Sequence, residues 1–194
     1  MKRILSLGAL ALLLLFCAGC GPGNNVRLLQ KPPDSNTLPA PGAPSVTVVE
    51  FQDKRGTGSE QLGVRRDKSS FTTNMRVAEW VSRSLADELS KLGLQVSYAT
   101  TVDQARSGKP GYIVTGTIDE VWLKESSAME LSATIRATMI VSGLKGRLLT
   151  EGLSASQTQK GLPGASVAEN LLLDTMQELV QPAARKADQV INKK

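Results

Sequence analysis

Residues 128–141 read AMELSATIRATMIV, and this stretch decides the fold class because apolar or small residues alternate with polar ones along it. Successive side chains of a β-strand point to opposite faces of a sheet, so a period of two predicts a strand with one buried and one polar face. The buried set is Met129, Leu131, Ala133, Ile135, Ala137, Met139 and Val141. The polar set is Glu130, Ser132, Thr134, Arg136 and Thr138.

Two further strands are predicted beside this one. Residues 112–123 are rich in Ile, Val, Thr and Trp, which favours an extended conformation. On the other side, the turn sequence at 143–146 (GLKG) leads into a strand from 147 to about 157. Short connections join antiparallel neighbours, so the three strands form a meander.

Helical periodicity marks two other segments. In residues 74–92, apolar side chains recur every three or four positions, and Gly93 stands where a helix often ends. After Gly164, Ser166 and Glu169 have the spacing of a capping box, which predicts the start of a long C-terminal helix. Pro182 predicts a kink or a split in that helix.

The region before the first helix opens with a β-branched run at 45–52, which predicts a strand, and continues as a long loop that ends near Ser70. Residues 94–98 predict another short strand. The fold class is therefore α+β, a mixed and mainly antiparallel sheet with two helices packed on one face, in a single domain spanning 45–194.

The N-terminus has the features of an export signal. Lys2 and Arg3 precede an apolar run at 4–16, and Ala18-Gly19-Cys20 follows. This context resembles the lipobox of bacterial lipoproteins, although Cys17 replaces the usual leucine. The resemblance implies a signal peptide at 1–19 and a lipid-modified, palmitate-bearing Cys20. The alternative is an ordinary secretory signal, which leaves Cys20 as a free thiol.

Residues 20–44 are predicted to form a tether, because six of the nine prolines fall between 22 and 44. Residues 26–29 (VRLL) interrupt it and either dock on the domain or the bilayer or remain extended. Both cysteines lie at or before position 20, so the mature domain cannot form a disulfide.

The chain resembles the YajG type of bacterial lipoprotein in its lipobox, in the opening strand that runs into residues 51–55 (FQDKR), in Leu62-Gly63, and in its element order. More loosely it resembles auxiliary lipoproteins of envelope lipid transport and the α+β lipoprotein of lipopolysaccharide assembly. These resemblances imply an anchored protein of the outer membrane that faces the periplasm, and they carry no catalytic residues. Gly21 after the cysteine agrees with outer-membrane sorting in enteric-type lipoproteins.

Composition narrows the chemistry. Histidine is absent, which removes the commonest general base and nitrogen metal ligand, and no phosphate-loop or hydrolase motif is complete. Asp119 and Glu120 are predicted to point to opposite faces of a strand, so they do not form a carboxylate pair. We therefore expect no enzyme activity, no cofactor and no metal site.

The charge indicates partners only weakly. Lys2 and Arg3 contribute two of the formal charges, so removal of the signal lowers the net charge from +5 to +3. No aromatic residues accompany the basic clusters, so nucleic acid is not expected. The predicted contact residues are Lys54, Arg55, Arg65 and Arg66, in the loop before the first helix. The alternative is that this loop is only a solvated excursion.

Taken together, these features predict a non-enzymatic, membrane-anchored accessory or assembly component that binds an envelope protein, with anionic lipid as a further partner. A lipid- or lipopolysaccharide-binding component of a transport system is the alternative. An apolar cavity would favour the alternative, and a solid core with an exposed edge would favour the first.

Overall fold

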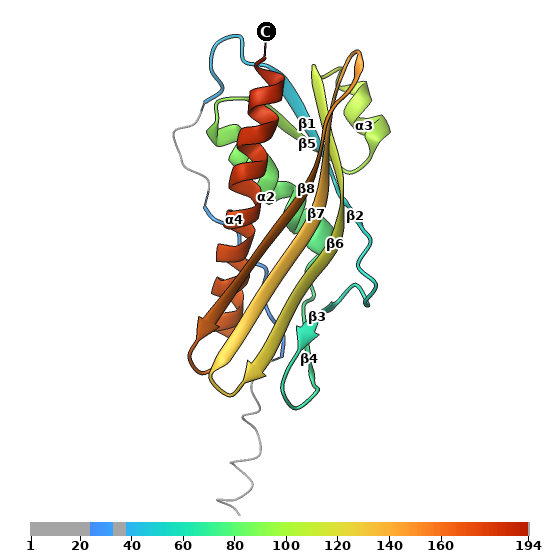
Figure 1. Ribbon diagram of the computed structural model, residues 1–194. Helices are drawn as coiled ribbons and strands as arrows, with labels where there is room; N and C mark the ends of the chain where they lie inside the picture. Colours follow the sequence, from blue (N-terminus) through green and yellow to red (C-terminus); the bar gives the residue numbers. More distant parts are fainter. Residues whose placement is uncertain (1–23, 33–37, 194) are drawn as a thin grey trace, which may run out of the picture.

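The computed structural model describes residues 24–32 and 38–193, so the predicted signal peptide and Cys20 lie outside the described residues. Within those ranges, eight strands form one sheet and three helices accompany it (Figure 1). Helices α2 (Val77–Lys91) and α4 (Ala165–Ile191) cover one face of the sheet. The predicted α+β class, with two helices on one face, is confirmed.

The meander is the largest part of the sheet. Strands β6 (Tyr112–Ser127), β7 (Glu130–Gly143) and β8 (Gly146–Lys160) pair antiparallel in that order. From Leu131 to Val141 every second side chain of β7 is buried, as the alternation predicts. Met129 is the exception, because it lies in the β6–β7 turn and is 54% exposed.

The other edge of β6 is shared among short parallel strands. β1 (Ser45–Val49), β2 (Gln52–Asp53) and β3 (Gln61–Val64) pair with it in turn. β5 (Gln95–Ala99) then pairs parallel with β1, and β4 (Ser70–Thr72) pairs antiparallel with β3. The segment predicted as one long loop up to Ser70 therefore contains β3, the end of β2 and the start of β4, none of which was predicted there.

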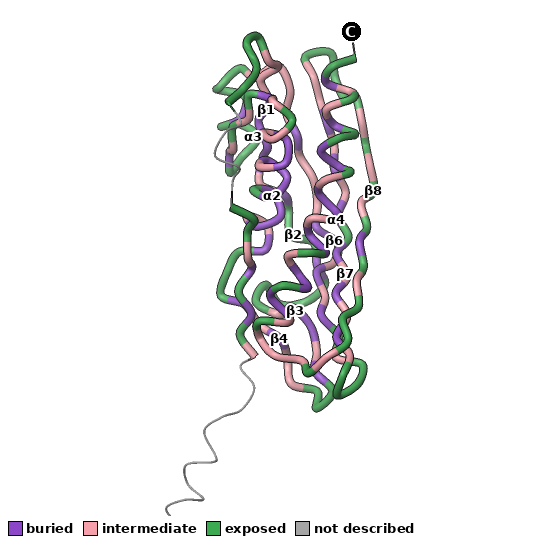
Figure 2. Tube along the Cα trace, turned by 90° about the vertical axis from the view of Figure 1, so that its left-hand side faces the viewer, coloured by how far each residue is buried: buried purple, intermediate pink, exposed green. Residues whose placement is uncertain are grey.

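The core lies between the two helices and the sheet, and Figure 2 shows the buried residues concentrated there. Helix α2 buries Val77, Val81, Leu85 and Leu89 as predicted, and Gly93 follows it with a φ of 83°. A third helix, α3 (Val102–Ser107), was not predicted and packs on β1 and β5.

Helix α4 differs from the prediction at its start. Its N-cap is Gly164, with no side-chain cap, so the capping box of Ser166 and Glu169 does not form. The Glu169 carboxylate instead binds Arg27, which lies 142 positions earlier in the chain. The helix runs through Pro182 as one element rather than two.

Candidate functional site

The basic residues predicted as a contact surface divide into two buried and two exposed side chains. Arg55 donates from Nε and Nη2 to the two carboxylate oxygens of Asp53, at 2.9 and 2.7 Å. It also donates to the carbonyl oxygens of Ser59 and Gln61. The Arg55 side chain is only 3% exposed, so its role is to hold the β2–β3 connection together.

Arg65 is also buried, with its guanidinium 4.5 Å from the ring centre of Phe71 and Nη1 3.5 Å from Glu125. The prediction that Arg55 and Arg65 offer contacts to a partner is therefore wrong, because both side chains are buried and pair with carboxylates inside the domain. The remaining two, Lys54 and Arg66, are exposed.

Lys54 and Arg66 do not form one patch. The Lys54 amide donates to the carbonyl of Ile118 on β6. Arg66 lies two residues after Val64, which pairs with Lys124 of the same strand. Six residues of β6 separate these two levels, which corresponds to about 20 Å along a strand. The sequence placed these cations in one loop, and the parallel pairing with β6 separates them.

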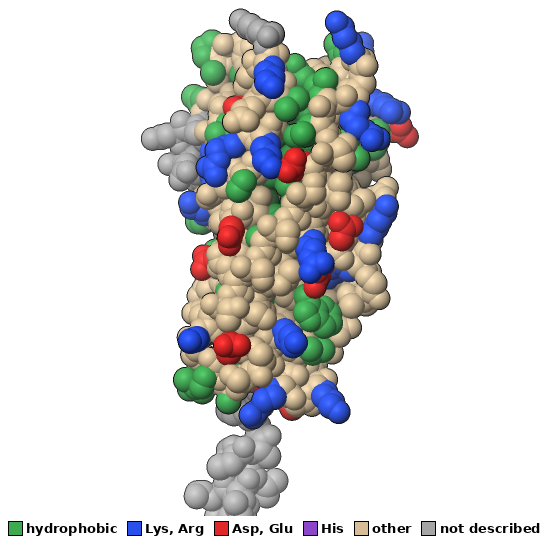
Figure 3. Space-filling model, in the orientation of Figure 1, with side chains coloured by type: hydrophobic (Ala, Val, Ile, Leu, Met, Phe, Trp, Pro, Cys, Tyr) green, Lys and Arg blue, Asp and Glu red, His purple; other side chains and the backbone are tan. Residues whose placement is uncertain are grey.

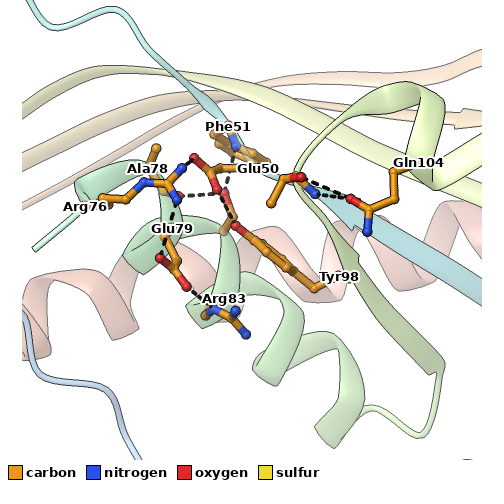
Figure 4. A network of polar contacts seen from close by, with 10 residues as sticks. Glu50, Phe51, Arg76, Ala78, Glu79, Arg83, Tyr98 and Gln104 are labelled. Carbon is orange, nitrogen blue, oxygen red and sulfur yellow. Dashed lines mark hydrogen bonds and ion pairs between the residues drawn. The ribbon is translucent and has the colours of Figure 1, made fainter.

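The most concentrated polar network lies at the carboxyl ends of β1 and β5, where open α/β sheets commonly bind ligands. Glu50 directly follows β1, and its Oε2 accepts a hydrogen bond of 2.7 Å from the Tyr98 hydroxyl. Its other oxygen binds Arg76, the N-cap residue of α2. Glu79 accepts a hydrogen bond from Arg83 Nε, and the Arg83 guanidinium lies 4.4 Å from the centre of the Tyr98 ring (Figure 4).

Nearby backbone groups belong to the same network. The Phe51 amide donates to Ser82 Oγ, which in turn donates to the carbonyl of Ala78. These bonds fix the chain after β1 against the first turns of α2. Glu50, a polar residue directly after a buried strand, is the feature of the sequence that indicates this site, but it was not among the predicted contact residues.

The electrostatics of this network favour a neutral tyrosine. Burial, followed by the hydrogen bond to Glu50 and the negative charge of that carboxylate, raises the pKa of Tyr98 well above its ordinary value of 10.0. Each charged side chain drawn in Figure 4 also has an oppositely charged partner. The arrangement therefore joins β1, β5 and α2 through hydrogen bonds and ion pairs.

Two hollows of about 570 and 580 Å³ flank this network. Glu50, Gln52 and Thr100 line both of them, so polar side chains contribute to each wall.

The carboxylates of Asp119 and Glu120 share one face of the sheet, contrary to the prediction. A bulge shifts the register between Ile118 and Glu120, so the strict alternation fails there. Glu120 pairs with Arg136 at 3.2 Å, and Asp119 accepts from Thr138, which lies on the same face of β7 as Arg136. Both carboxylates are therefore bound by side chains of β7.

Residues 24–29 form what we call the strap, a segment that packs across the domain. The amide of Val26 donates to the Thr72 carbonyl at 2.7 Å, and the Thr72 amide donates to the Asn24 carbonyl at 2.8 Å. Val26 and Leu28 are almost completely buried. Residues 26–29 therefore dock on the domain, which was one of the alternatives left open by the sequence.

Two polar contacts bind the strap to the helices. Arg27 donates from Nε and Nη2 to the two oxygens of Glu169 at the start of α4, at 3.0 and 3.1 Å. The Trp80 indole of α2 donates to the Leu29 carbonyl at 2.8 Å. The hydrogen bonds from Arg27, acting against burial, lower the pKa of Glu169 below its ordinary value of 4.5.

Within 24–32 and 38–193, no group of three or more His, Cys, Asp or Glu side chains is arranged to hold a metal ion. Over the same residues, no helix has both the length and the apolar character needed to span a membrane.

Comparison with known proteins identifies the fold alone. No protein-family model and no curated protein matches the chain. Protein XCC0632 from Xanthomonas campestris, of family DUF330, matches at 9% identity with a TM-score of 0.59, covering 88% of this chain and 93% of that one. An uncharacterised protein matches at 10% identity with a TM-score of 0.51, covering 84% and 96%. The lipoprotein GNA1162 from Neisseria meningitidis matches less closely, at 11% identity and a TM-score of 0.41, covering 70% and 99%.

Proposed function

We propose that this protein is a non-enzymatic lipoprotein of the bacterial envelope, anchored in the outer membrane through acylated Cys20, and that its periplasmic domain binds another envelope protein as an accessory or assembly component. The lipobox-like context of Cys20 supports the anchor. The free edge of β8 supports the protein partner.

Strand β8 is a long edge strand, and helix α4 packs against it. Within the described residues it pairs with β7 only, so its other side has no strand beside it. Charged side chains and prolines usually keep an edge strand from pairing with another chain. Residues 152–159 (GLSASQTQ) contain neither. An extended segment of a partner can add to such an edge through main-chain hydrogen bonds.

The adjoining open face of the meander suits the same role. Its side chains include Ser132, Thr134 and Ser156, and Figure 3 shows uncharged areas there between scattered acidic and basic side chains. Such a surface can lie against a partner with a smaller cost of charge desolvation than a charged face.

Site-specific photo-crosslinking in intact cells tests the edge. A photoreactive residue at Ser154, which is exposed on β8, should give a discrete adduct with a protein. The same residue at Arg185, exposed on α4, is the matched control and should give none. Thr158→Lys, which places a charge on an exposed position of the edge strand, should abolish the Ser154 adduct without changing the melting temperature. Equal adducts from both positions, or none from Ser154, would argue against the edge.

The anchor has a separate test. Cys20→Ser should stop labelling with a palmitate analogue and release the domain from sedimented membranes. Unchanged labelling in that variant would refute acylation at Cys20.

A further inference from the structure

We infer that one end of the domain, which we call the basal end, lies against an anionic membrane surface. The basal end consists of the β3–β4 turn (65–69), the β6–β7 turn (128–129) and the β8–α4 loop (161–164). The inference deepens the proposed function and rests on acylation of Cys20.

The three parts of the basal end lie together because of the sheet register. Val64, the last residue of β3, pairs with Lys124, three residues before the end of β6. Glu130, the first residue of β7, pairs with Lys160, the last residue of β8. The turns that follow these strands therefore leave the sheet at the same end, the lower one in Figure 1.

The strap fixes where the chain enters the domain. Asn24 and Val26 bracket Thr72 in a parallel arrangement, and Thr72 lies only two residues above the start of β4 at Ser70. The strap therefore begins close to the β3–β4 turn, and the burial of Val26 and Leu28 holds it there.

Chain length then decides which end can meet the bilayer. The four residue steps between Cys20 and Asn24 span at most about 14 Å, even when fully extended. Strand β7 has 14 residues and spans about 45 Å, so the β7–β8 turn at the opposite end is far beyond that reach. The acylated residue must therefore lie near the basal end.

The surface of the basal end has the chemistry of an anionic lipid contact. Leu162 is 75% exposed and Met129 is 54% exposed, so two apolar side chains project from adjacent turns. The exposed cations around them are Arg66, Lys68, Lys124 and Lys160, against the acids Asp67 and Glu130. Figure 3 shows basic and hydrophobic side chains at the lower end of that view.

Charge alone does not select this end, because the opposite end also carries basic residues, such as Lys145 and Arg147 around Leu144. The position of the strap decides which of the two ends faces the membrane. Each basic residue near an anionic surface strengthens its attraction roughly fivefold, so the excess of two positive charges left after Asp67 and Glu130 are counted biases the orientation once the anchor brings this end close.

Fluorescent labels test the orientation in the acylated full chain. The sequence after Cys20 contains no cysteine, so Leu162→Cys and Leu144→Cys each introduce one labelling site. Leu144 is the matched control, a leucine of the opposite end that is 93% exposed. The chains are reconstituted into phosphatidylcholine vesicles with or without phosphatidylglycerol, and quenching by nitroxide-labelled lipid is measured.

We expect quenching at position 162 to exceed that at 144 severalfold, and to increase when phosphatidylglycerol is present. Arg66→Glu combined with Lys160→Glu should remove that increase, whereas Lys145→Glu combined with Arg147→Glu should leave it unchanged. Equal quenching at both positions, or stronger quenching at a label on exposed Arg83 of α2 than at 162, would overturn the orientation. A chain that incorporates no palmitate analogue would instead refute the proposed anchor, so the two failures are distinguishable.

Discussion

Replacing Leu28 with alanine is the most direct perturbation of the strap. Its side chain is 2% exposed, so the substitution removes buried methyl groups and leaves a gap beside the core. Substitutions of this kind cost about 2–5 kcal/mol in protein cores. We expect about 2–3 kcal/mol, because a segment near the chain end relaxes more readily than a helix or a central strand.

Leu38→Ala is the matched control. Leu38 lies ten positions later and is 87% exposed, so the same substitution should change the free energy of unfolding by less than about 0.5 kcal/mol. Urea unfolding of both variants measures the difference, which corresponds to about 5–10 °C in melting temperature for a domain of this size.

Hydrogen exchange shows whether the loss is local. In Leu28→Ala, the amides of Val26 and Thr72, which bond across the strap and β4, should lose protection while those of β7 keep it. The reasoning is refuted if the Leu28 and Leu38 variants are equally stable, or if the Val26 amide is as unprotected in the parent chain as in the variant.

Three other comparisons give clear expectations. Ile135→Asp buries an unpaired charge and should cost about 4 kcal/mol or more, whereas Thr134→Asp on the open face should cost less than about 1 kcal/mol in the same urea experiment. Arg55→Ala removes a buried arginine that makes hydrogen bonds to a carboxylate and two carbonyls and should cost about 2–3 kcal/mol, while calorimetry of Lys54→Ala should show almost no change. The pKa of Glu169 is lower in the folded chain than its ordinary value of 4.5, so the ionised carboxylate stabilises the fold at pH values above 4.5. This contribution is lost as the pH falls through the lowered pKa. The stability of Glu169→Gln, measured from unfolding curves, should therefore depend less steeply on pH below 4.5 than that of the parent chain.

The meander was predictable because its pattern is long and is tied to burial. Residues 131–141 alternate over enough positions that a slip of one residue would expose the core side chains. The sheet edges were less predictable. Strands β3 and β4 have four and three residues, too few for a period to appear, and they form only because β6 provides a long edge for pairing.

The errors in the candidate site share a cause. A basic side chain near a turn has the same composition whether its charge is free or buried, and Arg55 is buried because Asp53 and two carbonyls surround it. A β-bulge has no characteristic amino-acid composition here, so the sequence did not indicate that Asp119 and Glu120 lie on one face. The strand register shows it. The partner of Glu169 lies 142 positions away, which a local capping pattern cannot indicate.

That separation of 142 positions also sets an order of events during synthesis. Arg27 is made long before Glu169, so the strap has no helix α4 to bind until nearly the whole polypeptide has been made. Contacts between such distant positions form late, because closing a long loop costs entropy before the contact stabilises it. Closure of the strap therefore marks the completion of the domain.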